Sequence, residues 1–390
     1  MLRSLYSGIS GLRAHQTMLD VTGNNIANVN TNGFKSSTTQ FQDTLSQLTQ
    51  GAAGPQAESG GTNPAQVGLG VKVAAVTTNF GQGSSQTTGR AEDMMINGDG
   101  FFVTSKGGQN LYTRAGSFNF DSSGQLVSPD GAVLQGWPAV NGVVNTGGPT
   151  SSLALSTNTL SPASATTRVG TSGNLPSDAA VGTEVTRDVK AFNANGEATT
   201  VALTFTKTNA GWNTSAVGPN GATANGTLGF TNGVRTSGGN LAVGGVTVDL
   251  SAVSGFAGNS NLTATASDGA AAGQLEGFTL GADGSLIGSF SNGTKQTLGR
   301  IALANFTNAS GLEKAGGSSY VATANSGNVQ LGAAGDAGLG TLAGGTLEMS
   351  NVDLSQEFTN LIVAQRGFQA NARIITTSDE VLQELSNLKR

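Results

Sequence analysis

The sequence predicts a mainly β protein with α-helical termini and discontinuous, nested domains. Apolar residues at heptad spacing occur at both ends of the chain, which indicates one amphipathic helix at each terminus. Short alternating apolar runs, separated by Asn-Gly and Asp-Gly pairs, lie between them and are typical of strands joined by tight turns. The 59 glycines and the low charged fraction of 11% agree with β domains rich in turns.

The N-terminal helix is expected to end in an asparagine-rich turn. Gly8 and Gly11 each cost about 1 kcal/mol in helix propensity, but they would let another backbone come close. The run from Asn24 to Gly33 favours turns and left-handed conformations, so the helix should stop there. Its heptad lines contain Leu2, Leu5, Ile9, Leu12, Leu19 and Ile26.

The stretch from Ser350 to Leu388 predicts a longer helix of about 55 Å, at about 1.5 Å per residue. Ser350 and Asp353 form a capping-box signature at its start. One heptad line is apolar throughout and the other is mixed. The two lines contain Leu354, Phe358, Leu361, Gln365, Phe368, Ala372, Ile375 and Leu382.

These heptad residues of both helices, which we call the terminal seam, allow two interpretations. The helices could form an intramolecular hairpin that caps one domain, or the seam could be completed by other copies of the chain. Isolated amphipathic helices are marginal in water, so the second interpretation predicts chain ends that are largely disordered in a lone molecule. It makes the terminal seam a subunit interface.

The remaining chain is interpreted as two β domains and their connections. Phe34 to Leu48 suggests a short or fragmentary helix, and Gly51 to Asn63 a loop or hinge. From Val67 the apolar period becomes two, and a Ser/Thr/Pro/Gly-rich passage from Asn145 to Ala179 suggests a crossing between domains. The expected division is residues 1–33 with 350–390 as a terminal helical domain, 34–66 with 320–349 as connecting segments, 67–144 with 278–319 as the first β-domain, and 145–277 as an inserted outer β-domain.

Composition excludes several classes of function. A net charge of −5 and the absence of any Lys/Arg cluster argue against a nucleic-acid partner. No stretch reaches the roughly 20 apolar residues of a membrane span, and the N-terminus lacks the apolar core of a cleaved secretory signal. There is no cysteine, so disulfides and thiolate metal sites are ruled out.

Positive signals for catalysis are missing from the sequence. His15 is the one histidine, and it lies in the N-terminal helix without a nearby carboxylate constellation. A Ser-His-Asp triad or a histidine metal site is therefore not expected. We predict no catalytic residue, no cofactor and no metal.

Several long motifs resemble the signatures of bacterial flagellar rod and hook proteins. The N-terminal motifs are Ser7 to Ala14, Leu19 to Asn28 and Thr31 to Lys35, and the C-terminal motifs are Ser350 to Ser355 and Ala364 to Arg373. Ile96 to Phe102, Tyr112 to Phe118 and Leu298 to Phe306 resemble the first β-domain of that family. Within the family, the length of the chain and its inserted region from about Asn145 to Gly277 are most similar to the hook members.

The resemblance implies a structural role outside the cell. It implies an extracellular homopolymer in the flagellar hook, a curved tube that acts as a universal joint and transmits motor torque to the filament. The terminal helices would form the inner axial domain, and the β-domains the outer layers. Implied partners are the rod, the hook cap, the hook-filament junction proteins and the flagellar type III export apparatus, which exports the chain without signal cleavage.

Three alternatives stay open at this point, and one of them is an exported hydrolase, which an assay of a truncation that retains Val67 to Phe306 would test. A distal flagellar rod protein with an unusual insertion would form straight polymers. A secreted β-rich adhesin or binding module would need no paired terminal helices, so their deletion would leave its binding intact.

Overall fold

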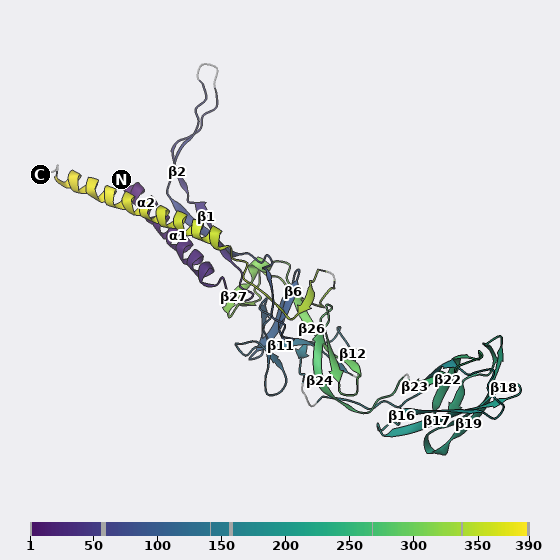
Figure 1. The fold of residues 1–390 in the computed structure, drawn as a ribbon. Helices are drawn as coiled ribbons and strands as arrows, with labels where there is room; N and C mark the ends of the chain where they lie inside the picture. The colour runs from purple at the N-terminus through teal and green to yellow at the C-terminus, as the bar shows by residue number, and fades with distance from the viewer. Residues whose placement is uncertain are drawn as a thin grey trace. The chain divides into compact units, whose positions relative to one another are not determined.

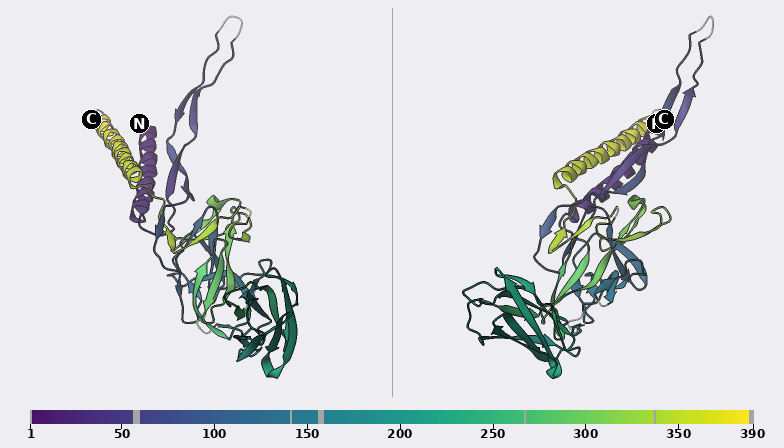
Figure 2. Two further views of the ribbon diagram at one scale, coloured as in Figure 1. Left: turned by 45° about the vertical axis from the view of Figure 1, so that its right-hand side comes forward. Right: turned by 90° about the vertical axis from the view of Figure 1, so that its right-hand side faces the viewer.

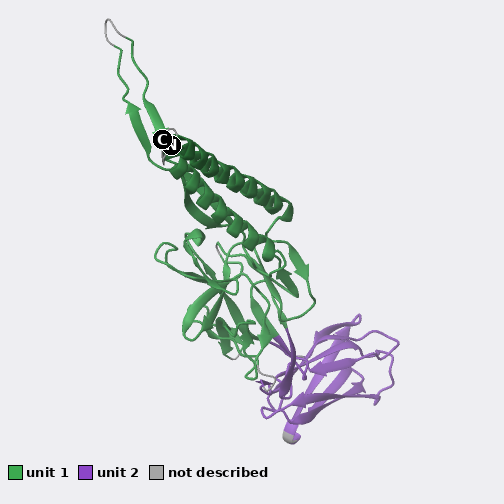
Figure 3. Ribbon diagram, turned by 90° about the vertical axis from the view of Figure 1, so that its left-hand side faces the viewer, with its two compact units in different colours: residues 1–155, 279–287, 297–390 green, residues 156–278, 288–296 purple. Residues whose placement is uncertain are grey.

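The computed structural model describes residues 2–55, 60–140, 142–155, 159–266, 268–336 and 338–387. They form two compact units, coloured separately in Figure 3. Unit 1 comprises residues 1–155, 279–287 and 297–390, and unit 2 comprises residues 156–278 and 288–296. The expected mainly β fold with a helix at each terminus is confirmed (Figure 1).

Both predicted helices are present in unit 1. Helix α1 is Leu2–Ala27 and helix α2 is Leu354–Asn387. The N-cap of α2 is Asp353, whose Oδ1 accepts hydrogen bonds from the backbone N–H groups of Ser355 (2.8 Å) and Gln356 (3.3 Å). The helix therefore begins three residues later than a capping box with Ser350 as the N-cap suggested.

The predicted short helix between Phe34 and Leu48 is wrong. This stretch forms β1 (Ser37–Asp43) and β2 (Ser46–Gln50), which pair antiparallel with β4 (Val71–Thr78) and β3 (Ala65–Gly68). A few apolar residues in this stretch have helical spacing. Backbone pairing with strands further along the chain outweighs this local preference, so the stretch forms strands. The ladder carries a register shift between Gln40 and Phe41, and the expected loop from Gly51 to Asn63 includes residues 56–59, which lie outside the described chain.

The β-domain of unit 1 is built around an antiparallel sheet in the order β26-β11-β7-β8-β28-β27. Its early strands are β5 (Ser85–Thr87), β6 (Met94–Asn97), β7 (Phe101–Lys106), β8 (Gln109–Thr113), β9 (Asn119–Phe120), β10 (Leu126–Val127), β11 (Val133–Val140), β12 (Val143–Val144) and β13 (Ser151–Ser152). Its late strands are β26 (Lys295–Asn305), β27 (Glu313–Gly316), β28 (Ser319–Val321), β29 (Gln330–Ala333), β30 (Thr341–Gly344) and β31 (Thr346–Glu348), with a 3₁₀ turn η2 at Ala309–Gly311.

Aromatic side chains fill the core of this domain. Tyr112 and Phe306 meet edge to face with ring centroids 4.8 Å apart, and Phe101 meets Phe306 at 5.9 Å and Tyr320 at 6.1 Å. Such edge contacts add roughly 0.5–1.5 kcal/mol per pair beyond area burial. Strands from both halves of the chain therefore share one core.

The segment 320–349 was expected to connect domains, and the structure instead places it in paired strands. β28 pairs with β8, β29 with β26, β30 with β6, and β31 with β5. The individual pairings are only a few residues long, and their partners lie far away in the sequence. The local pattern of this segment therefore gave no strand signal.

Unit 2 contains two sheets that share a hydrophobic core. One sheet is antiparallel in the order β16-β17-β18-β19-β20, and the other has the order β21-β22-β15-β23 with a parallel β15–β22 pair (Figure 1). Trp212, Phe205 and Val248 are fully buried between them. This two-sheet arrangement agrees with the sandwich expected from short, regularly spaced strands.

The remaining strands have the following bounds. They are β14 (Leu160–Ser161), β15 (Arg168–Asn174), β16 (Glu184–Phe192), β17 (Ala198–Thr208), β18 (Gly211–Val217), β19 (Thr223–Thr231), β20 (Val234–Ser237), β21 (Leu241–Val243), β22 (Val246–Ser254), β23 (Thr263–Ala266), β24 (Gly273–Leu280) and β25 (Ser285–Phe290), with a 3₁₀ turn η1 at Pro219–Gly221. β24, β25 and β26 each have residues in both units.

Several Asn-Gly pairs lie in hairpin turns, but not all of them do. Asn232 and Gly233 join β19 to β20 with φ of 52° and 77°, the left-handed values that a two-residue hairpin turn requires. Asn225 and Gly226 lie inside β19 and are not a turn. Here Gly226 lies against Leu241, and a Cβ at this position would come within 3.0 Å of its side chain.

Candidate subunit interface

The two terminal helices pack side by side and antiparallel within one chain (Figure 2). Gly8 lies against Ile374, Gly11 against Asn371, and the ring of His15 against Gly367. A Cβ on Gly367 would come within 2.5 Å of that ring, so the missing side chain makes room for the histidine. Small residues therefore allow the close approach expected of the N-terminal glycines.

The residues at these close glycine contacts do not belong to the terminal seam. They occupy heptad positions next to the predicted lines on each helix, and they are glycine, histidine, asparagine and isoleucine. The hairpin alternative thus describes how the helices meet. The expected disorder of the chain ends in a lone molecule remains a prediction.

The terminal seam consequently keeps apolar surface exposed. Leu354 and Leu382 are each 39% exposed, Phe358 is 52% exposed, and Gln365 is also exposed. The other described seam side chains are partly buried: Leu5, Ile9, Leu12, Leu19, Ile26, Leu361, Phe368, Ala372 and Ile375. The side chain of Leu2 lies outside the described part of the structure. Ile362, Val363 and Leu385 add further exposed apolar side chains to α2.

Polar bonds close the end of the helix pair that is nearest the β-domain. The buried Asn25 donates from Nδ2 to Glu357 Oε1 (3.1 Å) and to the carbonyl of Ser37 (2.8 Å), and its Oδ1 accepts from Ser37 N–H (3.0 Å). One asparagine thereby ties α1, α2 and the start of β1 together. Unlike the glycine contacts, these bonds set the register of the pair.

A buried ionic cluster lies directly beyond this junction. Lys35 Nζ contacts Glu348 Oε1 at 2.6 Å, and Arg114 Nη1 lies 3.6 Å from Glu348 Oε2. The side chains of Lys35 and Glu348 are fully buried and that of Arg114 is 3% exposed. The cluster joins residues from the N-terminal segment, the β-domain and the C-terminal segment.

Backbone groups add further hydrogen bonds to these charges. Lys35 also donates to the carbonyl of Gly81 (2.8 Å), Glu348 Oε1 accepts from Gly83 N–H (2.8 Å), and Arg114 donates to the carbonyl of Gly98 (2.9 Å). Burial lowers the pKa of Lys35, and the neighbouring Glu348 carboxylate opposes this shift. Burial likewise lowers the pKa of Arg114 against the attraction of Glu348.

The sequence analysis missed this cluster as a site. Lys35 and Arg114 lie in motifs that carry the family resemblance, yet neither was assigned a role. In a chain with 11% charged residues, a lysine directly after an Asn-Gly-Phe turn was a usable signal. Its partner Glu348 could not be identified from spacing, because 313 residues separate the two.

Structural signs of other site types are absent from the described chain. No group of three or more His, Cys, Asp or Glu side chains within it is placed to hold a metal ion. Neither described helix combines the length and apolarity that a membrane span requires.

Taken together, these features define a class of protein: a β-rich structural protein with a terminal helix pair that presents apolar side chains at its surface. The comparisons with known proteins are specific. The chain is 40% identical to the flagellar hook protein FlgE of Borreliella burgdorferi and 37% identical to that of Treponema pallidum, over 100% of both chains in each case. It is 34% identical to the flagellar basal-body rod protein FlgG of Bacillus subtilis, again over 100% of both chains.

Three family models match along the chain. The flagella basal body rod protein model matches residues 5–35, the flagellar hook protein FlgE/F/G D1 domain model residues 95–175, and the flagellar basal body rod FlgEFG protein C-terminal model residues 343–388. The crystal structure of the Helicobacter pylori flagellar hook protein FlgE2 superposes with a TM-score of 0.49 at 16% identity, over 66% of this chain and 98% of that chain.

The chain belongs to the flagellar hook protein family. The resemblance drawn from the terminal motifs is thereby confirmed, and with it the assignment as a structural subunit of the flagellar hook.

Proposed function

We propose that copies of this chain polymerise through the terminal seam into a curved tube, which acts as a universal joint between the motor and the filament. The observation that carries the proposal is that the seam stays partly exposed although the helices already pair within the chain. Burying one Leu, Ile or Phe side chain contributes roughly 1.5–3 kcal/mol, so a neighbouring copy that covers several of them gains substantial free energy.

Repeated contacts between identical subunits suit this arrangement. A contact that joins two different faces of one chain generates a helical polymer when it does not close into a ring. Bending of the tube requires neighbouring β-domains to slide past one another, and a surface with few charges offers few ion pairs to break. The rod, the hook cap, the hook-filament junction proteins and the type III export apparatus are the partners that this role requires, with export that leaves the N-terminus uncleaved.

The test is a charge placed within the terminal seam. Phe368→Asp or Leu361→Asp should leave a soluble, folded subunit that no longer polymerises, because a carboxylate buried in an apolar contact lacks a partner. Gln369→Asp is the matched control, since Gln369 is exposed beside Phe368 and lies off the seam. Assembly is followed by sedimentation and by negative-stain microscopy of the full chain. Normal tubes from the Phe368 variant would refute the seam as the interface.

A distal rod protein is the second candidate, and the full-length similarity to a basal-body rod protein favours it. The same microscopy separates the two functions. Curved tubes agree with the hook, whereas straight and stiff tubes agree with the rod.

A further inference from the structure

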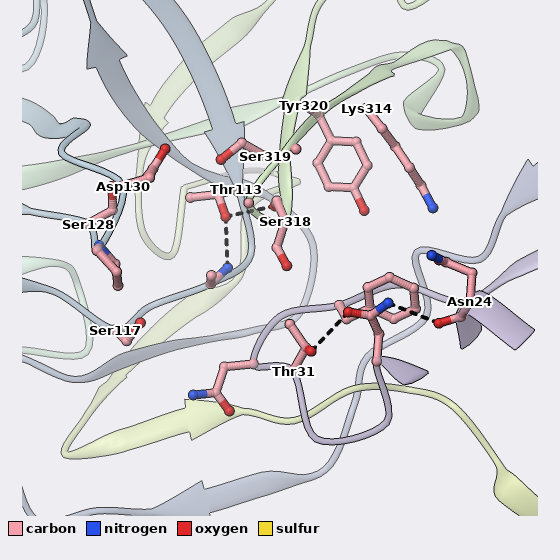
Figure 4. A pocket seen from close by; sticks show the side chains of 17 residues that line it. Asn24, Thr31, Thr113, Ser117, Ser128, Asp130, Lys314, Ser318, Ser319 and Tyr320 are labelled. Carbon is pink, nitrogen blue, oxygen red and sulfur yellow. Dashed lines mark hydrogen bonds between the residues drawn. The ribbon is translucent and has the colours of Figure 1, made fainter. Parts of the chain in front are cut away.

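A cavity of about 550 Å³ opens beside the C-terminal end of α1, entirely within unit 1 (Figure 4). The asparagine-rich turn forms one wall, and the turn between β27 and β28 forms another. Hydroxyl and amide side chains dominate the lining, with Asn24, Asn28, Thr31, Ser319 and Tyr320 among them. These groups can donate hydrogen bonds to an anionic ligand.

Lys314 brings a cation to this cavity. Its side chain extends from β27 toward Asn24 in the last turn of α1 (Figure 4). The ammonium donates to Ser37 Oγ (2.8 Å) and lies 5.3 Å from the centroid of the Phe34 ring. Although the side chain as a whole is exposed, its charged end lies deep enough for burial to lower the pKa of Lys314.

This ammonium has no counter-ion in the described chain. No ion pair among the described residues includes Lys314. Desolvation is the one cause of the lowered pKa of Lys314. Asp130 also lines the cavity, but its carboxylate pairs with Lys106 at 3.5 Å and accepts a hydrogen bond from Ser128. The ammonium of Lys314 is therefore partly desolvated, lies over the Phe34 ring and faces the open cavity. It has no carboxylate partner that would compensate its charge.

We propose that this cavity binds an acidic side chain of a second copy of the chain, which forms an ion pair with Lys314 in the polymer. The inference rests on the proposed self-assembly and adds a specific polar contact to it. The chain carries a net charge of −5, and α2 exposes Glu380 and Glu384, neither of which has an ion pair among the described residues. Asn24 lines the cavity and Ile26 of the terminal seam lies two residues further along α1, so the cavity and the seam both reach the same end of this helix.

The first experiment compares three lysine variants of the full chain. Lys314→Met should raise the critical concentration for assembly about tenfold, which corresponds to about 1.4 kcal/mol per subunit. Lys314→Arg should assemble nearly as the unmodified chain does, and Lys295→Met, at an exposed lysine on β26, should have no effect. The melting temperature of the Lys314→Met monomer should be equal or higher, because the substitution removes an uncompensated charge.

Two outcomes of this experiment overturn the proposal. Normal assembly of Lys314→Met would show that no partner uses the ammonium. A lowered monomer melting temperature with a matching loss of assembly would show that Lys314 supports only its own fold. The result for Lys314→Met can be distinguished from a failure of the proposed function. Normal polymers from Phe368→Asp would refute the proposed function, whatever the Lys314 variants show.

The second experiment identifies the partner. Carbodiimide treatment of polymers that mix isotopically labelled and unlabelled chains should join Lys314 to an Asp or Glu of another copy, as seen by mass spectrometry of the peptides. Links confined to one chain would overturn the proposal. So would inorganic phosphate that raises the monomer melting temperature in a manner dependent on Lys314, because the ligand would then be a small anion.

Discussion

At the scale of the residue, the ionic cluster of Lys35, Glu348 and Arg114 holds the ends of the chain to the β-domain. A buried ion pair adds little net stability compared with an apolar replacement, but removing one partner leaves an uncompensated buried charge. Glu348 serves two cations, so the cluster depends on this carboxylate more than on either cation. The guanidinium of Arg114 also lies 5.3 Å from the centroid of the Phe101 ring, which links it to the aromatic core.

Glu348→Gln should therefore lower the free energy of unfolding of unit 1 by about 3–5 kcal/mol. Lys35→Met should lower the free energy of unfolding by less, because Arg114 still compensates the charge of Glu348. Urea unfolding measures both, followed by the fluorescence of Trp137 in a Trp212→Phe background, since the other tryptophan lies in unit 2.

Lys106→Met is the control for this series. Lys106 pairs with Asp130 at the surface with 52% of its side chain exposed, and such pairs contribute about 0–1 kcal/mol. Equal losses for Glu348→Gln and Lys106→Met would contradict the role given to the buried cluster.

At the scale of the element, the helix pair explains why glycines occupy helical positions. Gly367 interrupts α2 at a cost of about 1 kcal/mol relative to alanine, and in exchange α1 comes close enough for His15 to lie over the glycine backbone. The His15 ring also meets Phe41 of β1 edge to face at 5.6 Å. Strand β1 and helix α2 thus both contact the side chain of His15 on α1.

Gly367→Ala and Gly23→Ala should have opposite effects. Gly23 lies exposed in α1 with no atom within 4 Å of an added Cβ, so alanine there should stabilise the helix by about 0.5–1 kcal/mol. Alanine at position 367 should instead lower the melting temperature of the helices, because its Cβ displaces the His15 ring. Circular dichroism at increasing temperature measures both.

A further substitution tests the cause of the Gly367 effect. His15→Ala in the Gly367→Ala background should restore part of the lost stability, since the clash is removed. Stabilisation by Gly367→Ala alone would mean that the helices do not approach as closely as the structure shows.

At the scale of the whole molecule, unit 1 is assembled from three separate stretches of chain. β11 pairs with β26, with Trp137 opposite Arg300, and Lys35 pairs with Glu348. Unit 2 consists of residues 156–278 and 288–296, and each of these stretches lies between two stretches of unit 1 in the sequence. The expected nesting of one β-domain within another remains a prediction that proteolysis can examine.

Limited proteolysis of the full chain should cut near the junctions of the two units. We expect fragments that cover roughly residues 1–155 and 297–390 to elute together under native conditions and to separate only in denaturant, because the sheet and the ionic cluster connect them. A compact fragment limited to residues 67–135 that survives alone would contradict this organisation.

The amino-acid sequence alone determined the helical termini, the β character of the middle and membership of the flagellar family, because helix and strand periodicities are local and the terminal motifs are long. It also predicted main strands of unit 2, such as β17 and β22, whose alternation is regular. Tertiary structure decided which helix faces meet, that β1 pairs with β4 and β2 with β3, and that Lys35 forms an ion pair with Glu348. These outcomes depend on close packing, backbone pairing and charge pairing between segments that are distant in the sequence, and local spacing carries no record of such contacts.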